Sequence, residues 1–461
     1  MRHICLWSQA ALTAVLIACS VSVANADTLY WWTTSNSGNW SATSSSTYNH
    51  WSSTQGVVGT EAWVNGSDAY FTSATTNGTF YIKTVANESS VEVTNMTFAS
   101  LGKVTYKFTG TGSTVNLYGD STITVAGSSS SALDVADFQV ALAGASSLTK
   151  VGIGKLQLDV ANPDFTGTLN MQLGTLVVNN VNALQNSTLN FTNGALSFNT
   201  QTAATFGGLS GGKTFALSIS GNTVAVALSV GNNNATTTYS GVMSGIGTLT
   251  KIGSGKLTLT GANTYTGATT ISDGTLALVN NGSIASSASI DVANGATLKV
   301  SDVTDGFSLA SGQTLKGNGS VVGDVTIASG ATLAPGNSIG ALTFDSNVTL
   351  ANGSTTLMEI GASSSDLISV GGALALDGTL KVTDDGTVTY AAGQSWDLFD
   401  ASSFSGSFSS YDLPTLAAGL SWNTSAVGTT GEISIVPEPT TAVMLLSGLL
   451  GLIAYAWRKR K

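Results

Sequence analysis

Two segments of this chain are copies of each other, and this repetition constrains the fold more than any other feature. SLTKVGIGKLQLDVANPDFTGTLNMQLGTLVV, residues 147–178, aligns with TLTKIGSGKLTLTGANTYTGATTISDGTLAL, residues 248–278. Lys150 aligns with Lys251, and the first copy has one extra residue near Pro163. Since a unit this short cannot bury an apolar face alone, we expect the copies to stack in one solenoid.

Within each copy the side chains alternate as they do in a β-strand. Leu257 and Leu259 are expected to point inward, with Thr258 and Thr260 facing outward. Each apolar run ends at a Gly or Asn, the residues that accept left-handed turns. The pattern therefore predicts many short strands joined by tight turns.

A leucine within a Thr-Leu dipeptide recurs along the second half of the chain at intervals of 22, 17, 18 and 17 residues. The leucines are Leu276, Leu298, Leu315, Leu333 and Leu350. This spacing is typical of one coil of a parallel β-solenoid. We predict an all-β chain in which residues 147–435 form a right-handed parallel β-helix containing both repeat copies.

Composition agrees with this fold, argues against a helical protein and excludes nucleic-acid binding. Only 9% of the residues are charged, which is too few for the wet faces of surface helices. Between Asp27 and Val436 there are 11 Lys, no Arg and 25 Asp or Glu. Because nucleic-acid binding depends on neutralising phosphates, this acidic body is not expected to bind nucleic acid.

The first 26 residues have the pattern of a secretory signal peptide. A short basic start at Arg2 precedes an apolar stretch, and Ala24 and Ala26 fit the small-residue rule for cleavage. The run ending at Cys19 offers a competing lipoprotein site, in which Cys19 is lipidated. Cleavage after Ala26 removes both cysteines of the chain, so we expect no disulfide in the exported body.

Residues 27–146 form a separate aromatic-rich region before the first repeat copy. We predict that it caps the open end of the solenoid and supplies the first coils, since solenoids need covered ends. Sugar binding by the flat aromatic faces is the alternative. The aromatic residues concerned are Tyr30, Trp31, Trp32, Trp40, Tyr48, Trp51 and Trp63.

The C-terminus has the features of a single membrane-spanning helix. Residues 442–457 are apolar and would rise ~24 Å as a helix, slightly less than the ~30 Å hydrocarbon core. Four cations follow at the very end: Arg458, Lys459, Arg460 and Lys461. By the positive-inside rule they keep this end in the cytoplasm and leave the body outside the cytoplasmic membrane.

The tail VPEPTTAVMLLSGLLGLIAYAWRKRK, residues 436–461, resembles the PEP-CTERM sorting signal of Gram-negative bacteria. It has the Pro-Glu-Pro motif at Pro437, Glu438 and Pro439, then a short apolar helix and a basic end. The resemblance implies sorting by an exosortase and association with cell surfaces and with extracellular polysaccharide or biofilm matrices. A plain single-pass anchor is the alternative interpretation.

The repeat copies resemble the autotransporter-associated β-strand repeat, which is named from the passenger domains of secreted β-helices. Residues 331–344, ATLAPGNSIGALTF, are similar to a coil-and-turn element of such passengers. The resemblance implies a surface-exposed β-helix.

The sequence contains patterns found in phosphate-binding and catalytic sites, but the residues around them do not fit such sites. Residues 207–214, GGLSGGKT, match a phosphate-binding loop, yet the following residues alternate as a strand, whereas such a loop needs a helix there. His50 is the only histidine beyond the signal peptide, and Asp384-Asp385-Gly386 is a turn pattern. We predict no catalytic residue, no cofactor and no metal site.

Two hypotheses of function follow. The first is a non-enzymatic structural or adhesive β-solenoid that an exosortase sorts to the surface. The second is a glycan-binding or glycan-degrading enzyme on the same scaffold. A groove lined by three or more Asp or Glu on one face would favour the second hypothesis.

Overall fold

The computed structural model describes residues 28–31, 37–40, 51–52, 65–73, 77–84, 90–100, 103–110, 114–129, 132–219, 221–438, 450, 452–453 and 455–459. Several predicted features lie outside these ranges. They are the signal peptide with Cys19, Ala24 and Ala26, and also His50, Pro439, Arg460 and Lys461.

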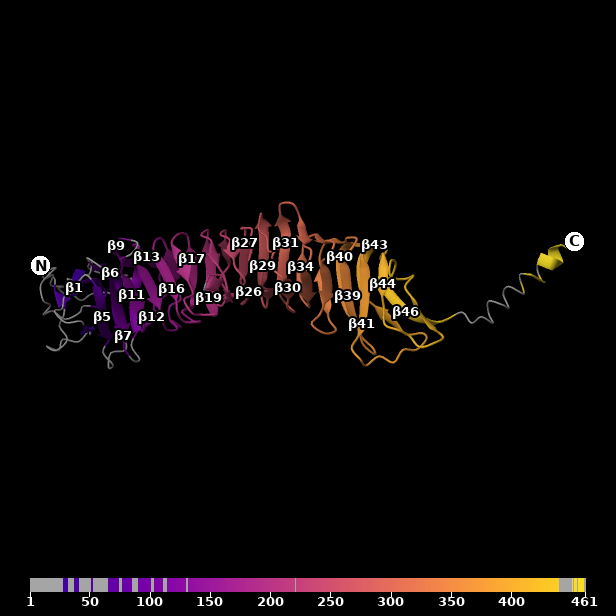
Figure 1. Ribbon diagram of the computed structural model, residues 1–461, viewed down its shortest axis with the longest axis horizontal. Helices are drawn as coiled ribbons and strands as arrows, with labels where there is room; N and C mark the ends of the chain where they lie inside the picture. The colour runs from indigo at the N-terminus through magenta and orange to yellow at the C-terminus, as the bar shows by residue number, and fades with distance from the viewer. Residues whose placement is uncertain are drawn as a thin grey trace, which may run out of the picture.

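The chain forms an elongated parallel β-solenoid, seen side-on in Figure 1. Most strands pair in parallel with the corresponding strand of the next coil, so hydrogen bonds run along the rod. Among the described residues, one sheet has 30 strands and a second has seven. The seven strands are β2 (Ser37–Trp40), β5 (Asn77–Thr84), β7 (Lys103–Thr109), β11 (Val135–Phe138), β14 (Lys155–Leu158), β16 (Thr175–Val178) and β18 (Ala195–Ser197). The predicted all-β parallel solenoid is confirmed.

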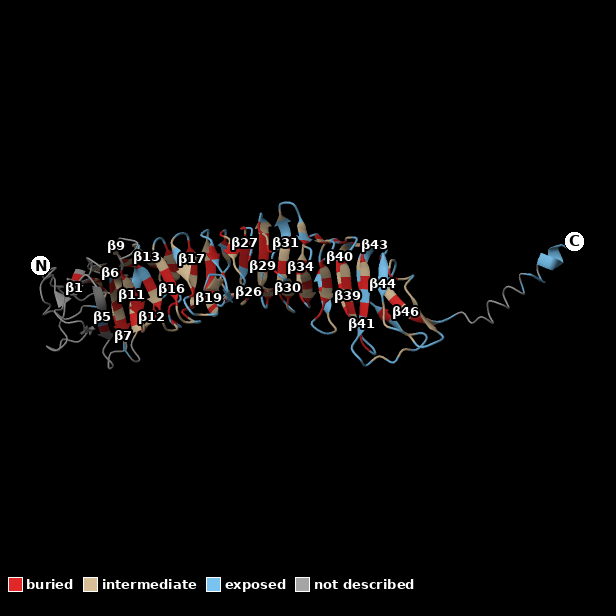
Figure 2. Cartoon of the chain, viewed as in Figure 1, coloured by how far each residue is buried: buried red, intermediate tan, exposed pale blue. Residues whose placement is uncertain are grey.

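The two repeat copies have the same local structure. The first contains β13 (Leu148–Val151), β14, β15 (Thr168–Met171) and β16. The second contains β26 (Thr248–Lys251), β27 (Lys256–Leu259), β28 (Thr269–Ile271) and β29 (Thr275–Asn280). Buried and partly exposed residues alternate along β13, β15 and β26, and Figure 2 shows this banding on the solenoid, because successive side chains point to opposite faces. In β16 and β27 the alternate residues Val177 and Thr258 are buried as well, although Thr258 was expected to face outward.

The leucine ladder is confirmed in part. Leu257, Leu276 and Leu298 are register partners in successive coils, and each is at most 1% exposed. The next partner is Val321 in β34 (Ser320–Val322), whereas Leu315 in β33 (Thr314–Gly317) pairs with Ile290 in another ladder.

The prediction that each Thr-Leu dipeptide marks one coil is therefore wrong. Four of the five dipeptides mark the start of a strand, where a polar residue precedes the first inward apolar one, whereas Thr349-Leu350 ends β38 (Val348–Leu350). Each coil has several strands. Along this ladder the coils repeat instead at 19, 22 and 23 residues, from Leu257 to Leu276, Leu298 and Val321. In the other ladder, Leu315 and Leu333 are register partners 18 residues apart, as the dipeptide spacing predicted.

A buried lysine of each copy binds three backbone carbonyls. The Lys150 Nζ donates to the carbonyl oxygens of Val151 (2.8 Å), Gly152 (2.8 Å) and Leu173 (3.2 Å), the last in the next coil. The side chain is fully buried, and burial lowers the pKa of Lys150 to about 7. Three acceptors match the three donors of an ammonium group, so the lysine stabilises the stacked turns.

The second copy repeats this arrangement. The Lys251 Nζ donates to the carbonyl oxygens of Ile252 (2.8 Å), Gly253 (2.6 Å) and Asp273 (3.2 Å). Burial also lowers the pKa of Lys251, while the nearby Asp273 acts in the opposite direction. The two lysines that align in the sequence therefore make equivalent contacts in the structure.

A buried asparagine in each copy joins three successive coils. The Asn263 Oδ1 accepts from the Met243 amide (2.9 Å), and its Nδ2 donates to the Gly261 (2.9 Å) and Ser283 (3.1 Å) carbonyls. Asn162 likewise accepts from the Leu142 amide (2.7 Å) and donates to the Ala183 carbonyl (2.7 Å).

Aromatic rings fill the core of the N-terminal coils. Phe71 of β4 (Ser67–Ser73) stacks on Phe98 of β6 (Ser90–Ser100) with 4.8 Å between ring centroids. Phe108 stacks on Phe138 at 4.3 Å, and Phe98 meets Phe108 edge-on at 5.7 Å. The predicted aromatic cap stays a prediction, because the side chains of its Trp and Tyr residues lie outside the part of the chain that is described.

A three-stranded antiparallel sheet closes the C-terminal end of the solenoid, where the sequence indicated only further coils. Its strands are β42 (Ser395–Asp397), β46 (Glu432–Pro437) and β45 (Leu420–Asn423), with β46 in the centre. Trp396 is 4% exposed, and its Nε1 donates to the Gly361 carbonyl at 2.8 Å. We call this sheet, with the chain between its strands, the C-terminal cap.

Beyond the cap, residues 450, 452–453 and 455–458 are helical, within the segment drawn in yellow in Figure 1. Within the described part of the chain, no helix has the length and apolarity needed to cross a bilayer. Most of residues 442–457 lie outside that part, so the predicted membrane helix is not confirmed and stays a prediction.

Candidate functional site

Two rows of polar side chains run along the outer face of the seven-stranded sheet. In the first row, Lys107, Asp137 and Gln157 are register partners on β7, β11 and β14. The second row lies two residues further along each coil, on the same face. It consists of Gln139, Asp159, Asn179 and Asn199.

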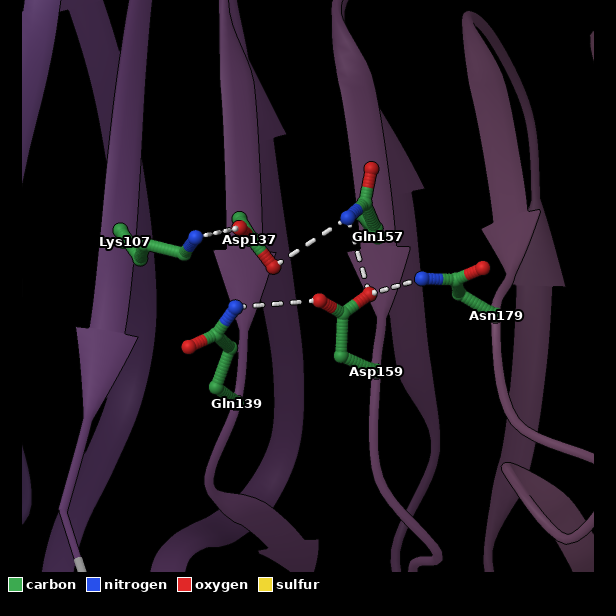
Figure 3. A network of polar contacts seen from close by, with 6 residues as sticks. All are labelled: Lys107, Asp137, Gln139, Gln157, Asp159 and Asn179. Atoms are coloured by element: carbon green, nitrogen blue, oxygen red, sulfur yellow. Dashed lines mark hydrogen bonds and ion pairs between the residues drawn. The ribbon is translucent and has the colours of Figure 1, made fainter. Parts of the chain in front are cut away.

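Hydrogen bonds connect the rows across four coils, as Figure 3 shows. Asp159 is the centre, where its carboxylate accepts from Gln157 (2.8 Å), Gln139 (3.2 Å) and Asn179 (3.0 Å). The Gln157 Nε2 also reaches Asp137 at 3.4 Å, and the Lys107 Nζ lies 3.5 Å from the Asp137 carboxylate. The second row continues where the Asn199 Nδ2 donates to the Asn179 Oδ1 at 2.9 Å.

Asp137 is the most buried carboxylate of these rows, with 6% of its side chain exposed. Burial and, to a smaller extent, the neighbouring Asp159 raise the pKa of Asp137 to about 6, against the opposing effect of Lys107. A carboxyl group with this pKa gains a proton between neutral and mildly acidic pH.

Replacing Asp137 with Asn is expected to reduce the pH dependence of stability. Because the folded-state pKa of Asp137 lies above the ordinary 3.8, its stabilising contribution is complete below pH 4 and is lost as the pH rises through about 6. After allowance for solvent screening, the parent should lose about 1 kcal/mol more than D137N between pH 4 and pH 7.5. Denaturant unfolding at the two pH values measures this difference.

Asp164 is exposed and provides the matched control, since D164N also removes one carboxylate from the same coils. Equal pH dependence in the parent and D137N would contradict the assignment.

The second polar row ends at an open cavity of about 520 Å³. Asn199, the last member of the second row, and Ser197 are among its lining residues. The first row does not reach the cavity, because the buried Val177 lies between Gln157 and Ser197 in the register. The opposite wall comes from the hairpin of β21 (Ser218–Ile219) and β22 (Val224–Ala225), with Asn222 at its turn. Its polar lining consists of hydroxyl, amide and backbone groups.

The chemistry of this face favours hydrogen bonding over catalysis. The rows hold two carboxylates, fewer than the three that would favour a glycan-active enzyme. Among the described residues, no group of three or more His, Cys, Asp or Glu is arranged to bind a metal ion. Neutral amides and hydroxyls are suited to a ligand that is itself rich in hydroxyl groups.

A second cavity, of about 290 Å³, contains two carboxylates, Glu359 and Asp366. Asp366 is 3% exposed, and its carboxylate accepts from the amides of Gly340 (2.8 Å) and Glu359 (2.7 Å). Burial raises the pKa of Asp366 to about 6, against the effect of these two hydrogen bonds. The carboxylate is occupied in joining the backbone at Gly340 to Glu359 of β39 (Thr355–Ile360), which is a structural role.

The other motifs in the sequence have structural roles too. The phosphate-binding pattern at 207–214 begins inside β19 (Ala203–Gly211) and is followed by β20 (Phe215–Ala216), so no helix N-terminus follows it. The Asp384 and Asp385 carboxylates bind the amides of Gly386 (2.9 Å) and Thr387 (2.8 Å) and thereby fix the predicted turn.

The structure places the predicted sorting residues at the end of the C-terminal cap. Pro437 is the last residue of β46 and pairs with Leu420, and the Glu438 amide donates to the Gly419 carbonyl at 2.9 Å. Pro439 lies outside the described residues. Arg458 ends the helical residues, and the Lys459 Nζ lies 5.8 Å from the centre of the Tyr455 ring.

Comparison with known families identifies this tail. The family model described as the PEP-CTERM protein-sorting motif matches residues 436–461. The chain carries a PEP-CTERM sorting motif. Such a motif implies recognition by a sorting enzyme of the exosortase type, so the match supports an exported, surface-associated protein.

Two further comparisons find similar sequences, each over a minor part of the chain. The passenger-associated transport repeat matches residues 249–278, which are essentially the second repeat copy. Over 112 residues, or 23% of this chain, the sequence is 38% identical to the adhesin BmaC autotransporter of Brucella suis biovar 1 (strain 1330). The matched segment covers only 3% of that protein.

Sequence reasoning identified the PEP-CTERM motif and the repeats but missed the polar rows and the C-terminal cap. The second row was visible as polar residues spaced by 20 positions, from Gln139 to Asn199. Its members are Gln, Asp and Asn, so a comparison of identical residues does not find them.

Proposed function

We propose that this protein is a structural or adhesive β-solenoid that an exosortase sorts to the cell surface. The observation that carries the proposal is the order of parts: a rod of stacked parallel coils leads directly into a PEP-CTERM motif. A rod delivered by its end presents long lateral faces to its surroundings. The relative named as an adhesin supports an adhesive role for those faces.

In this proposal each terminal segment has one task. The signal peptide, cleaved after Ala26 with Ala24 as the other small residue, starts export. The helix at 442–457 holds the chain in the cytoplasmic membrane, and the cations at 458–461 fix its orientation. The exosortase then recognises Pro437, Glu438 and Pro439. Extracellular polysaccharide, as in a biofilm matrix, is the proposed surrounding material.

Changing Pro437, Glu438 and Pro439 together to Ala is expected to block surface delivery while leaving export and membrane insertion intact. The prolines favour an extended backbone, and Glu438 is the only charged residue between Glu432 and Arg458. A simple membrane anchor does not require such a segment, whereas a sorting enzyme that recognises the segment requires it. Fractionation of tagged protein, in cells with and without an exosortase, measures size and location.

The expected result is that the triple variant resembles the parent protein in cells that lack the exosortase. Delivery of the triple variant with the size and yield of the parent would show that the motif is only a linker.

The polar rows on the seven-stranded sheet favour glycan binding as a second candidate function. Their amides and carboxylates, of which the second row leads to the cavity lined by Ser197 and Asn199, suit a neutral, hydroxyl-rich chain lying along the rod. Binding of purified protein to an array of neutral oligosaccharides tests this candidate, and uniform absence of binding would exclude it for the glycans on that array.

A further inference from the structure

The sorting motif begins inside the folded body. Strand β46 is the central strand of the C-terminal cap, and its pairing with β45 continues to Pro437, which is opposite Leu420. The next residue is also held, because the Glu438 amide donates to the Gly419 carbonyl at 2.9 Å. Two of the three motif residues are therefore attached to the cap by their backbone.

Aromatic packing fixes the part of the cap that holds the motif. Trp422 lies on β45, and its ring centroid is 5.7 Å from that of Trp396 and 5.8 Å from that of Tyr390. The Trp422 Nε1 donates to the Pro414 carbonyl at 2.8 Å. On β46, Ile433 and Ile435 are at most 1% exposed. The strand that ends in the motif is thus anchored on both sides.

The side chains of the motif remain accessible although its backbone is held. Pro437 and Glu438 are both exposed. Pro437 has no amide hydrogen, so it can end the strand without leaving a donor unpaired. The cap consequently holds an extended Pro-Glu segment with its single carboxylate facing solvent.

We propose that the C-terminal cap is part of the surface that the sorting enzyme recognises. This inference rests on the proposed function. The enzyme binds Pro437 and Glu438 while Leu420 and Gly419 hold them in the extended form, so it does not have to order a flexible segment itself. Ordering a free segment costs affinity, and a held segment avoids that cost. Chains whose cap has not folded are sorted poorly.

Two insertions of the same flexible Gly-Ser spacer distinguish recognition of the cap from an effect of a longer connection between body and membrane. One spacer is placed between Val436 and Pro437, which detaches the motif from the cap. The other follows Thr440, which leaves the motif on the cap. Both insertions lengthen the connection between body and membrane equally, and both keep the motif sequence, the apolar run and the terminal cations.

In exosortase-containing cells, the spacer before Pro437 is expected to slow surface delivery roughly tenfold, and the spacer after Thr440 to leave it at the parental rate. Hydrogen exchange of the full chain in detergent provides a second measurement. The Glu438 amide should be protected in the parent and in the second insertion, and should exchange freely in the first.

Each outcome has one meaning. Equal rates for the two insertions, whether slow or parental, would overturn the role of the cap. A Glu438 amide that exchanges freely in the parent would overturn it as well. If the variant with Ala at 437, 438 and 439 is delivered like the parent, the proposed exosortase sorting fails, and this result is distinct from the comparison of spacers.

Discussion

Replacing Leu276 with Asp is expected to destabilise its coil by about 4 kcal/mol or more. Leu276 is fully buried and lies between its register partners Leu257 and Leu298. An aspartate at this position places a carboxylate in an apolar stack with no cation to pair with it. Because each coil contacts only its neighbours, the unfolding should begin in the coils around residue 276.

Limited proteolysis followed by mapping of the first cleavage sites shows where unfolding begins, and thermal unfolding measures the loss of stability. Ser272 is exposed on the same coil, so S272D adds the same charge without burying it and should change stability by no more than about 0.5 kcal/mol. If L276D has the same melting temperature and the same protease resistance as the parent, the inward stacking of Leu276 is contradicted.

Replacing Asn263 with Leu is expected to cost about 2–4 kcal/mol, although the two side chains are similar in size. The amide of Asn263 bonds groups from three successive coils, and the residue is 3% exposed. A leucine leaves the Met243 amide without this acceptor in a site that water does not reach. N162L should behave alike in the first copy, since Asn162 makes the corresponding bonds.

Asn294 is exposed and supplies the control, because N294L makes the same chemical change at the surface. Thermal unfolding of the three variants distinguishes a bridging role from a general effect of losing an amide. Equal melting of N263L and N294L would mean that the bridges between coils contribute nothing to stability.

The strands and their inward residues could be predicted because alternation is a local property. Leu257 and Leu259 have apolar neighbours two positions apart, and the side-chain geometry of a strand follows from that spacing alone. The number of residues in a coil could not be predicted in the same way. Leu298 and Leu315 both follow a threonine, but only the pairing with Val321 or Ile290 shows that they belong to different ladders.

The C-terminal cap could not be predicted because its contacts join residues with no common period. Trp396 and Trp422 are far apart in sequence, and their strands meet only through β46 between them. The polar rows could not be predicted either. Asp137 and Asp159 share one face because β11 and β14 pair in parallel, and that register depends on the length of the coil. The sorting motif needed no fold at all for its identification, since its residues are contiguous.

The duplicated lysine and asparagine contacts also bear on how such a rod changes in evolution. Lys150 and Lys251 bind equivalent carbonyls, and Asn162 and Asn263 bridge equivalent coils. A duplication or deletion of one whole copy in the gene would join surfaces that already match and would leave both termini unchanged. The length of the rod can therefore vary by recombination between copies, independently of the apparatus that exports and sorts it.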